Sequence, residues 1–330
     1  MFRMILAFLA VSALPGCQVP YYSQAIQGQW EIWRLQRPVA NLLKNPATPG
    51  DLRSRLLLAQ EIVAFAEEHL SLPAGNNYRT YADLKRDSVL WSVFATPELS
   101  VEAVTWKYPV VGALAYRGYF SPDQAQTFAD KQRADGLDVA IAPVPAYSTL
   151  GWFNDPLLNT FLNDPPRQLA SLIFHELTHK RYYRAGDTAF SEALAVAVER
   201  EGVRRWLRDH HDVDGLATYE RRLRAVDDFV RRVLTARDTL KTLYASDLPE
   251  QAQRTEKRKI LDALQADIRQ LLTGSGSNSA TDSFWLDAPL GNAHLNVISA
   301  YYLSVPEFEN LLETCDGDWE RFYVEVKRLP

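Results

Sequence analysis

The chain has little cysteine, no excess of basic residues and no long apolar run at its start. Cys17 and Cys315 are its 2 cysteines, so a framework of several disulfides is excluded and the core has to hold the fold together. The N-terminal apolar run, Ile5 to Leu14, is ten residues long, whereas a membrane-spanning helix needs about 20. Lysine and arginine number 36 against 41 acidic residues, a net charge of −5, which gives no basis for a nucleic-acid partner.

The first residues have the layout of a bacterial lipoprotein signal. Met1 to Arg3 supply a short positive start, and the apolar run leads to Leu14-Pro15-Gly16-Cys17. This segment is similar to a lipobox, although Pro15 departs from the small residue usual at that position. We expect residues 1–16 to be a signal peptide and Cys17 to carry lipid, which would leave Cys315 without a disulfide partner. The alternative is an ordinary secretory signal that is cleaved elsewhere, with Cys17 as a structural cysteine.

The residue after Cys17 favours one of the two membranes of a Gram-negative envelope. Aspartate there would retain a lipoprotein in the inner membrane of many such bacteria, and by resemblance to those sorting rules Gln18 favours an outer-membrane anchor facing the periplasm. We expect residues 17–330 to form a single domain. Its sheet-containing part would be residues 17–186, and its helical part residues 187–330.

The strongest motif is His-Glu-Leu-Thr-His at residues 175–179, which fits the pattern HExxH. Apolar residues precede it at helical spacing without glycine or proline, so the motif is predicted to lie on a helix. The spacing of four puts His175 and His179 on one helix face, where both imidazoles can reach one zinc ion. Glu176 beside them is the predicted general base. The alternative is that these are ordinary residues of a helix surface.

The third protein ligand has to come from outside the motif. A metzincin extension would need glycine and histidine where the chain has Tyr182 and Ala185. A turn at Gly186 and a second apolar-periodic stretch from Thr188 predict a helix that folds back over the first. Glu192, in the first turn of that helix, is the predicted third ligand of the zinc ion.

Two other carboxylates compete for the same role. Asp187 lies in the turn, and Glu199 lies two helical turns after Glu192 on the same face. Glu199 could instead support a ligand through a hydrogen bond.

The hydrophobic pattern predicts an α+β fold that is predominantly helical. It would combine a zincin-like active-site helix with a small mixed or antiparallel sheet and long C-terminal helices. An aromatic stripe predicts a helical hairpin over residues 22–45 and 52–70 that packs in the core, and residues 88–121 have the composition of a small meander sheet. Further helices are predicted over residues 123–135, from Thr188, and over residues 214–247, 250–272 and 289–315.

Asp138 to Tyr147 is predicted to be an edge strand, because a sheet tolerates its two prolines only at an edge or beyond it. A loop that merely reaches the helix is the alternative. Zincins bind an extended peptide along such a strand, by strand addition. Residues 148–156, a polar and aromatic loop, are expected to frame the cleft.

Several segments together are similar to one known family. They are the lipobox, Tyr21 to Ala25 with Gly28-Gln29, Ser148 to Pro156, the HExxH helix, Phe190-Ser191-Glu192 and the helix from Asn292 to Tyr301. Over nearly the whole mature chain, the sequence resembles the bacterial putative aminopeptidase lipoprotein family. The resemblance implies a gluzincin-like zinc peptidase. Ser191 stands in place of the asparagine of the gluzincin signature, so a hydrogen bond next to Glu192 is expected to differ.

The expected mechanism is hydrolysis of peptide bonds by water that zinc has activated. Glu176 would take the proton of that water and pass it to the departing amine. Gluzincins often supply a tyrosine or histidine from outside the motif as hydrogen-bond donor to the developing oxyanion. Tyr301 is the first candidate for this role, and Tyr302 and His294 are the others.

The expected substrate is a peptide or protein of the envelope. An aminopeptidase also needs an acidic group that captures the free amine, for which Glu102, Asp155 and Glu199 are candidates without rank. An endopeptidase is one alternative. A non-catalytic lipoprotein scaffold or assembly factor with a vestigial zinc site is another, from a different class.

Overall fold

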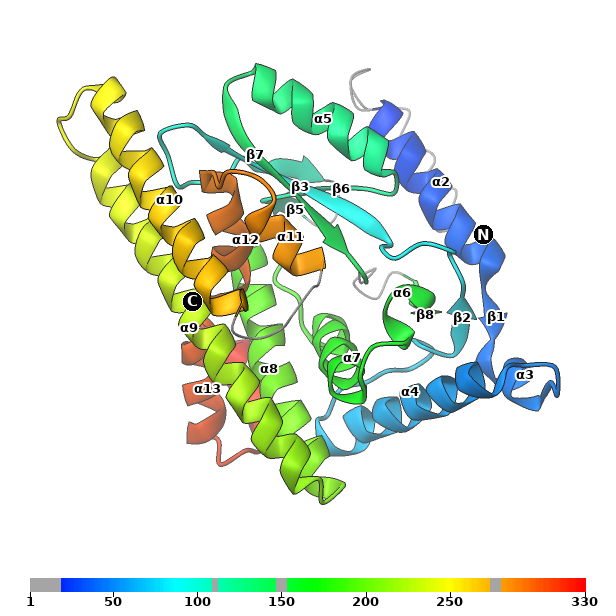
Figure 1. The fold of residues 1–330 in the computed structure, drawn as a ribbon. Coiled ribbons are helices and arrows are strands. Elements are labelled where there is room, and N and C mark those ends of the chain that lie inside the picture. The colour runs from blue at the N-terminus through cyan, green and yellow to red at the C-terminus, as the bar shows by residue number, and fades with distance from the viewer. Residues whose placement is uncertain (1–18, 109–111, 147–152, 274–279) are drawn as a thin grey trace.

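The computed structural model describes residues 19–330 apart from residues 109–111, 147–152 and 274–279. Figure 1 shows the arrangement of the elements. The expected signal peptide, residues 1–16, and Cys17 lie outside the described residues, and so does the part of the expected cleft loop before Phe153.

The described chain is α+β and predominantly helical, as predicted. Its helices are α2 (Val19–Leu35), α3 (Val39–Lys44), α4 (Gly50–His69), α5 (Pro122–Ala134), α6 (Asn159–Leu162), α7 (Pro166–Arg181), α8 (Thr188–Asp209), α9 (Val213–Tyr244), α10 (Glu250–Thr273), α11 (Ala280–Leu286), α12 (Asn292–Tyr302), α13 (Val305–Thr314) and α14 (Trp319–Val326). Its strands are β1 (Arg37–Pro38), β2 (Thr80–Ala82), β3 (Leu90–Pro97), β4 (Trp106–Tyr108), β5 (Gly112–Leu114), β6 (Arg117–Tyr119), β7 (Leu137–Val144) and β8 (Leu157–Leu158).

The strands form small sheets, of which the one next to the helical core has the order β6-β3-β7. Strand β3 is antiparallel to both neighbours, and its register runs from Leu90 opposite Val144 to Pro97 opposite Leu137. Strand β7 therefore lies at the edge of this sheet, as predicted. Pro143 is tolerated near its end because an edge strand has one side without ladder hydrogen bonds. Helix α5 packs on the same sheet (Figure 1).

The predicted meander is wrong in its connectivity. Strand β6 pairs directly with β3, and the segment between them forms a separate hairpin of β4 and β5. In the middle of the predicted meander, residues 100–107 were expected to form one of its strands, but only the end of this segment is paired, from Trp106 in β4. Val104 and Trp106 pack against the apolar cluster between this sheet and α5, where the ring of Trp106 lies 5.9 Å from that of Phe128.

The predicted N-terminal helical hairpin is also wrong. Helix α2 ends at Leu35, before an extended pair of residues at Arg37 and Pro38 that joins β2. Proline has no backbone N–H and restricts the residue before it, which breaks a helix. Helix α2 consequently packs beside the strands while α4 packs against α7 (Figure 1). The stripe on α2 is only partly in the core, because Ile32 is buried but the side chain of Trp30 is 59% exposed.

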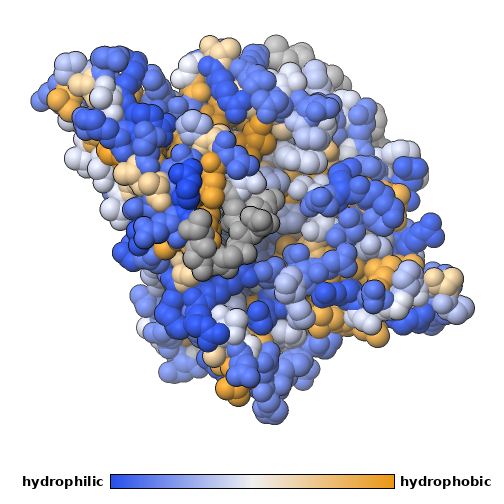
Figure 2. All heavy atoms as spheres, viewed as in Figure 1, coloured by the Kyte–Doolittle hydropathy of each residue, from blue (hydrophilic) through white to orange (hydrophobic). Residues whose placement is uncertain are grey.

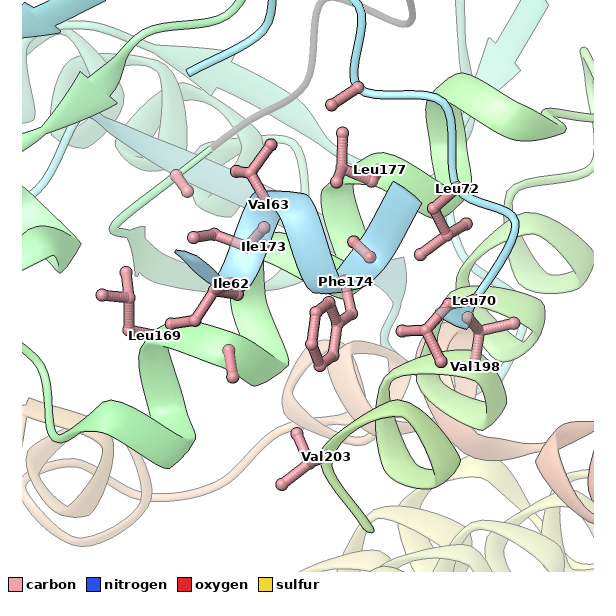
Figure 3. Close-up of a cluster of buried hydrophobic side chains, with 14 of the residues drawn as sticks. Ile62, Val63, Leu70, Leu72, Leu169, Ile173, Phe174, Leu177, Val198 and Val203 are labelled. Atoms are coloured by element: carbon pink, nitrogen blue, oxygen red, sulfur yellow. The ribbon is translucent and has the colours of Figure 1, made fainter. Parts of the chain in front are cut away.

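The main core lies between α4, α7 and α8. Figure 3 shows side chains of α4 and the following loop meeting those of α7 and α8. The labelled residues are Ile62, Val63, Leu70, Leu72, Leu169, Ile173, Phe174, Leu177, Val198 and Val203. A Cβ at Gly202 of α8 would lie 2.8 Å from Cδ2 of Phe174 and 2.9 Å from Cδ1 of Leu70, so glycine is needed for this approach. Burial of one face of α7 fixes the orientation of its other face.

Helices α9 and α10 form a long pair along one side of the molecule (Figure 1). A second apolar cluster, which includes Val233, Leu261 and Trp285, fills the space between this pair and the helices after it. The outward face is mostly hydrophilic (Figure 2), in agreement with the charge pattern of both helices. Among the described residues, no helix is both long enough and apolar enough to cross a membrane.

Candidate metal centre

The motif residues lie on α7, as predicted. Pro166 stands in the first turn, where its missing N–H costs no hydrogen bond. The buried apolar residues of the helix, such as Phe174 and Leu177, face the core. His175 and His179 therefore share the opposite side of the same turns.

A short connection brings α8 back over α7. Gly186 has a φ of +83°, a left-handed value that favours glycine. Asp187 is the N-cap of α8, and its side chain accepts a hydrogen bond from the N–H of Phe190. Ser191 accepts from the N–H of Arg184 at 3.1 Å and donates to the carbonyl of Asp187 at 3.0 Å. These bonds set the start of α8 and so the position of Glu192.

Three potential ligand atoms converge between the two helices. Nε2 of His175 lies 3.1 Å from Oε2 of Glu192 and 3.2 Å from Nε2 of His179, and Nε2 of His179 lies 3.4 Å from Oε2 of Glu192. Ligand atoms about 2.0–2.1 Å from a tetrahedral zinc ion are about 3.3–3.4 Å apart. Two imidazole nitrogens and one carboxylate oxygen are also a donor set that zinc binds. The cluster thus fits a metal ion with one further position open.

The other two candidates for third ligand lie elsewhere. Asp187 caps α8 and pairs loosely with Arg184 at 3.9 Å. Oε2 of Glu199 lies 3.0 Å from Nδ1 of His175, the ring nitrogen that points away from Glu192. Glu199 thus occupies the supporting position that its helix face suggested.

Burial and opposite charges shape the electrostatics of the cluster. Burial raises the pKa of Glu192, but His179 and His175 outweigh it and lower that pKa to about 2. Burial lowers the pKa of His175, but hydrogen bonds to Glu192 and Glu199 and their charges raise it well above its ordinary value. The carboxylates thus favour a positive charge at this position.

Glu176 lies beside the cluster, between two cavities. Its Oε2 is buried and has no hydrogen-bond partner among the described residues. Burial raises its pKa, against the attraction of His175 and His179. On one side is a cavity of about 10 Å³ lined by Tyr78 and Asp155, and a volume of this size holds about one water molecule. On the other side is a larger cavity, which we name the main cavity.

The main cavity has a volume of about 410 Å³, and His175, Glu176 and Glu199 are among the residues that line it. Its walls come from α7, α8, α9, α12 and the end of β7, where Val144 and Pro145 line it. The edge strand thus reaches the cavity beside the HExxH helix. A volume of this size is typical of small-molecule and short-peptide sites.

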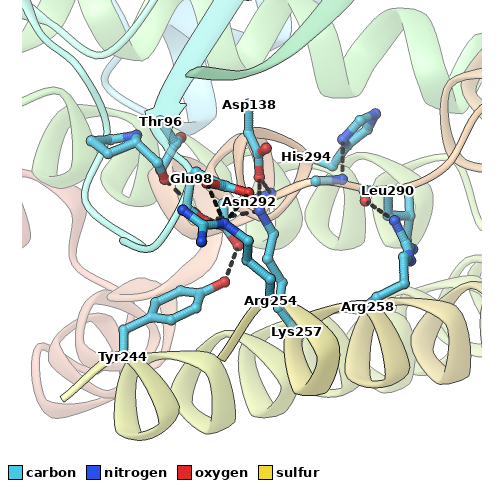
Figure 4. A network of polar contacts seen from close by, with 12 residues as sticks. Thr96, Glu98, Asp138, Tyr244, Arg254, Lys257, Arg258, Leu290, Asn292 and His294 are labelled. Carbon is cyan, nitrogen blue, oxygen red and sulfur yellow. Dashed lines mark hydrogen bonds and ion pairs between the residues drawn. The ribbon is translucent and has the colours of Figure 1, made fainter. Parts of the chain in front are cut away.

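The predicted oxyanion donors are placed differently from one another. The ring of Tyr301 stacks on that of His175 with a centroid distance of 6.3 Å. Tyr302 also lines the cavity, and its ring lies 5.8 Å from Cζ of Arg200. His294 lies outside the site. It accepts a hydrogen bond from the N–H of Gly291 at the start of α12, in the polar network around Asp138 (Figure 4). His294 is therefore excluded as an oxyanion donor.

The three candidates for capture of a substrate amine are also separated. Glu102 is 73% exposed and pairs with Arg237 of α9 at 3.6 Å, so it lies on the surface. Asp155 is buried on the far side of Glu176, in the small cavity. Glu199 lines the main cavity but is bonded to His175.

Two tyrosines near the cluster were not expected from the sequence. Burial, and after it the charge of Glu192, raises the pKa of both Tyr116 and Tyr183. The ring of Tyr183 lies 6.1 Å from that of His179, four residues earlier, and this spacing is a signal that sequence reasoning could have used. Tyr116 follows β5, far away in the sequence, and no local pattern connects it with the motif.

Comparison with known proteins gives one match. Residues 20–330 match the family described as putative aminopeptidase. No curated protein and no solved structure shows significant similarity to the chain. Because the match covers nearly all of the sequence, the protein belongs to this putative aminopeptidase family.

Proposed function

We propose that the protein is a zinc-dependent peptidase of the gluzincin type. The observation that carries this proposal is the convergence of His175, His179 and Glu192, with 3.1–3.4 Å between their facing atoms, beside Glu176 and a cavity. Membership of the family supports a peptidase function at the coarser level.

Glu176 is the general base of the proposed reaction. Zinc at this site would polarise the scissile carbonyl and increase the acidity of a water molecule. Glu176 accepts a proton from the attacking water, since its Oε2 has no hydrogen bond to any residue that the structure describes, and then delivers the proton to the departing amine. No acyl intermediate on the protein is required.

Two further residues support this step. Glu199 accepts a hydrogen bond from Nδ1 of His175, which leaves the lone pair of Nε2 free to bind a metal. The hydroxyl of Tyr301 donates a hydrogen bond to the oxyanion that forms on the substrate. Its ring stacks on His175, which places it at the same wall of the cavity.

An aminopeptidase is our first assignment, in agreement with the family description. One observation favours the endopeptidase alternative. Among the described lining residues of the main cavity, the carboxylates are Glu176 and Glu199, and both already have roles in the proposed chemistry. Cleavage of peptides with free and with acetylated N-termini separates the two, because only an aminopeptidase requires the free amine.

The test uses the chain from residue 18 onward and its Glu176→Gln variant. Both proteins should bind about one zinc ion per chain, and only the first should cleave peptides. Equal hydrolysis by the two would contradict the proposed mechanism. Zinc without any cleavage by either protein would favour the scaffold alternative.

We also propose that the protein is a lipoprotein anchored through Cys17 in the outer membrane and facing the periplasm. The support is the lipobox-like sequence from Leu14 to Cys17 and the residue Gln18. An anchor at this location would give the peptidase access to peptides of the envelope.

A further inference from the structure

We propose that Arg167 and Arg222 form a subsite that binds a carboxylate of the substrate, at the end of the main cavity away from the metal centre. The inference rests on the proposed peptidase function and defines its substrate class as peptides with an acidic group on one side of the cleaved bond. It is carried by the balance of charges along the cavity wall.

Both arginines line the main cavity but come from different helices. Arg167 is half-buried in the first turn of α7, and Arg222 is exposed on α9. Gln168 lies between them and, with its amide oxygen turned toward α9, accepts hydrogen bonds from Nη1 and Nη2 of Arg222, the latter at 3.1 Å. This neutral amide holds the guanidinium without cancelling its charge.

Neither arginine forms an ion pair with any residue that the structure describes. Asp164 lies near Arg222 but outside the lining of the cavity; its burial raises its pKa, and the charges of Arg55 and then Arg222 lower it. This one carboxylate faces two arginines and forms an ion pair with neither, so it does not cancel the charge of Arg222.

The other charged residues of the cavity are balanced. Arg200, also in the wall, pairs with Asp227 at 2.6 Å and with Glu309 at 3.4 Å. Oε2 of Glu199 pairs with Nδ1 of His175 at 3.0 Å. The remaining carboxylate of the wall, Glu176, belongs to the metal centre. Away from the metal centre, the unbalanced charge of the described cavity wall is therefore positive and is located at Arg167 and Arg222.

Helix geometry gives the position of this charge relative to the cleaved bond. Arg167 precedes His175 by eight residues on α7, so their Cα atoms are about 12 Å apart along the helix. An extended peptide advances about 3.3 Å per residue. A carboxylate held by Arg167 therefore belongs to a residue about two to four positions from the scissile bond.

A guanidinium binds a carboxylate through paired hydrogen bonds, which the opposite charges of the two groups strengthen. The carboxylate can come from an acidic side chain or from the C-terminus of a short peptide. Both sources present the same chemistry to the arginines. Amidation of the C-terminus distinguishes them, because it removes the terminal carboxylate and leaves an acidic side chain unchanged.

The experiment measures binding with the zinc-loaded Glu176→Gln variant, so that it does not depend on turnover. The probes are three kinds of alanine-based hexapeptide. The first has an amidated C-terminus and no acidic group. The second has an amidated C-terminus and one glutamate, whose position is varied along the peptide, and the third has a free C-terminal carboxylate and no glutamate. Calorimetry gives Kd for each probe. The same probes are used with Arg167→Gln and Arg222→Gln added, and with Arg221→Gln as matched control. Arg221 is the neighbour of Arg222 on α9, and its guanidinium bonds Thr218 at the surface.

We expect an acidic group two to four residues from the cleaved bond to lower Kd by about 10- to 100-fold relative to the neutral probe. The advantage should be lost with Arg167→Gln and Arg222→Gln and kept with Arg221→Gln. An effect confined to the free C-terminus would identify the terminal carboxylate as the ligand. Equal Kd for acidic and neutral probes, or an advantage that survives both substitutions, would overturn the subsite. Loss of zinc or of Glu176-dependent cleavage would overturn the proposed function instead, and the binding result would still decide the subsite.

Discussion

Oε2 of Glu199 lies 3.0 Å from Nδ1 of His175, on the side of the ring opposite to the cluster with His179 and Glu192. A carboxylate in this position accepts a hydrogen bond from Nδ1–H and so fixes the tautomer in which Nε2 carries the lone pair. It also increases the basicity of the ring as a metal ligand. The two residues are 24 positions apart and belong to different helices.

Replacement of Glu199 by glutamine should weaken zinc binding about 10- to 100-fold, because the amide can still accept the hydrogen bond but carries no charge. The measurement is competition for zinc with a chelator of known affinity. Glu201→Gln is the matched control, since Glu201 lies on the same helix and pairs with Arg205 at 3.2 Å. An unchanged zinc affinity in Glu199→Gln would show that the contact does not support the ligand.

Replacement of Glu192 by alanine should remove most of the zinc from the purified protein, because it deletes one of the three converging ligands. Asp187→Ala should keep the zinc and instead cost about 1 kcal/mol of stability, as expected for loss of an N-cap. Metal content and urea unfolding of both variants give the answer. Zinc lost from Asp187→Ala but kept by Glu192→Ala would reverse the ligand assignment.

The convergence of His175, His179 and Glu192 could be predicted from the sequence because these residues are close together along the chain. The spacing of His175 and His179 fixes their common face on any helix, and a short turn at Gly186 forces the next helix back over the first. Glu192 then has to lie near both histidines. The choice between Glu192 and Asp187 depended on the cap of α8, which one sequence leaves open.

The parts that the sequence does not predict depend on contacts between distant segments. Trp30 belongs to an apolar stripe but is largely exposed, because Pro38 ends the helical segment and α2 packs beside the strands. Arg222 reaches the cavity only because α9 crosses near α7, and nothing in its charged neighbourhood distinguishes it from Arg221. Periodicity shows that a face is solvated, and tertiary packing decides what that face meets.

Tyr301→Phe should lower kcat by about 10²- to 10³-fold, the usual loss when one oxyanion donor is removed. The phenyl ring keeps the stacking on His175, so zinc content and folding should not change. Tyr302→Phe is the control, because Tyr302 lines the same cavity but its ring contacts Arg200, at 5.8 Å from Cζ to the ring centroid. Steady-state kinetics on one peptide decides the role. A kcat near that of the unmodified protein would pass the role to Tyr116 or Tyr183.

The lipid anchor is tested with the full chain produced in a Gram-negative host. Metabolic labelling with a fatty acid should mark the protein and place it in the outer-membrane fraction. Cys17→Ala should lose the label, whereas Cys315→Ser should keep it, because Cys315 is 2% exposed and lies in the core. Label that survives Cys17→Ala would contradict the lipobox assignment.

Because His294 is buried, the protein should lose stability in mild acid. Burial lowers its pKa from 6.5 to about 4, and its Nδ1 accepts from the N–H of Gly291 at 3.0 Å within the network of Figure 4. The unfolded chain therefore binds a proton at this residue below about pH 6.5, while the folded chain does so only below about pH 4. Stability falls as the pH decreases through this window.

The expected size of the effect follows from the two pKa values. Between pH 7 and pH 5, His294 should remove about 2 kcal/mol from the free energy of unfolding. Other groups also titrate in this range, so the comparison is with His294→Gln, which offers an acceptor to Gly291 but does not titrate. Urea unfolding of both proteins at the two pH values isolates the contribution. If both lose the same free energy, His294 is protonated in the folded protein or keeps its ordinary pKa there, and the acid sensitivity belongs to other residues.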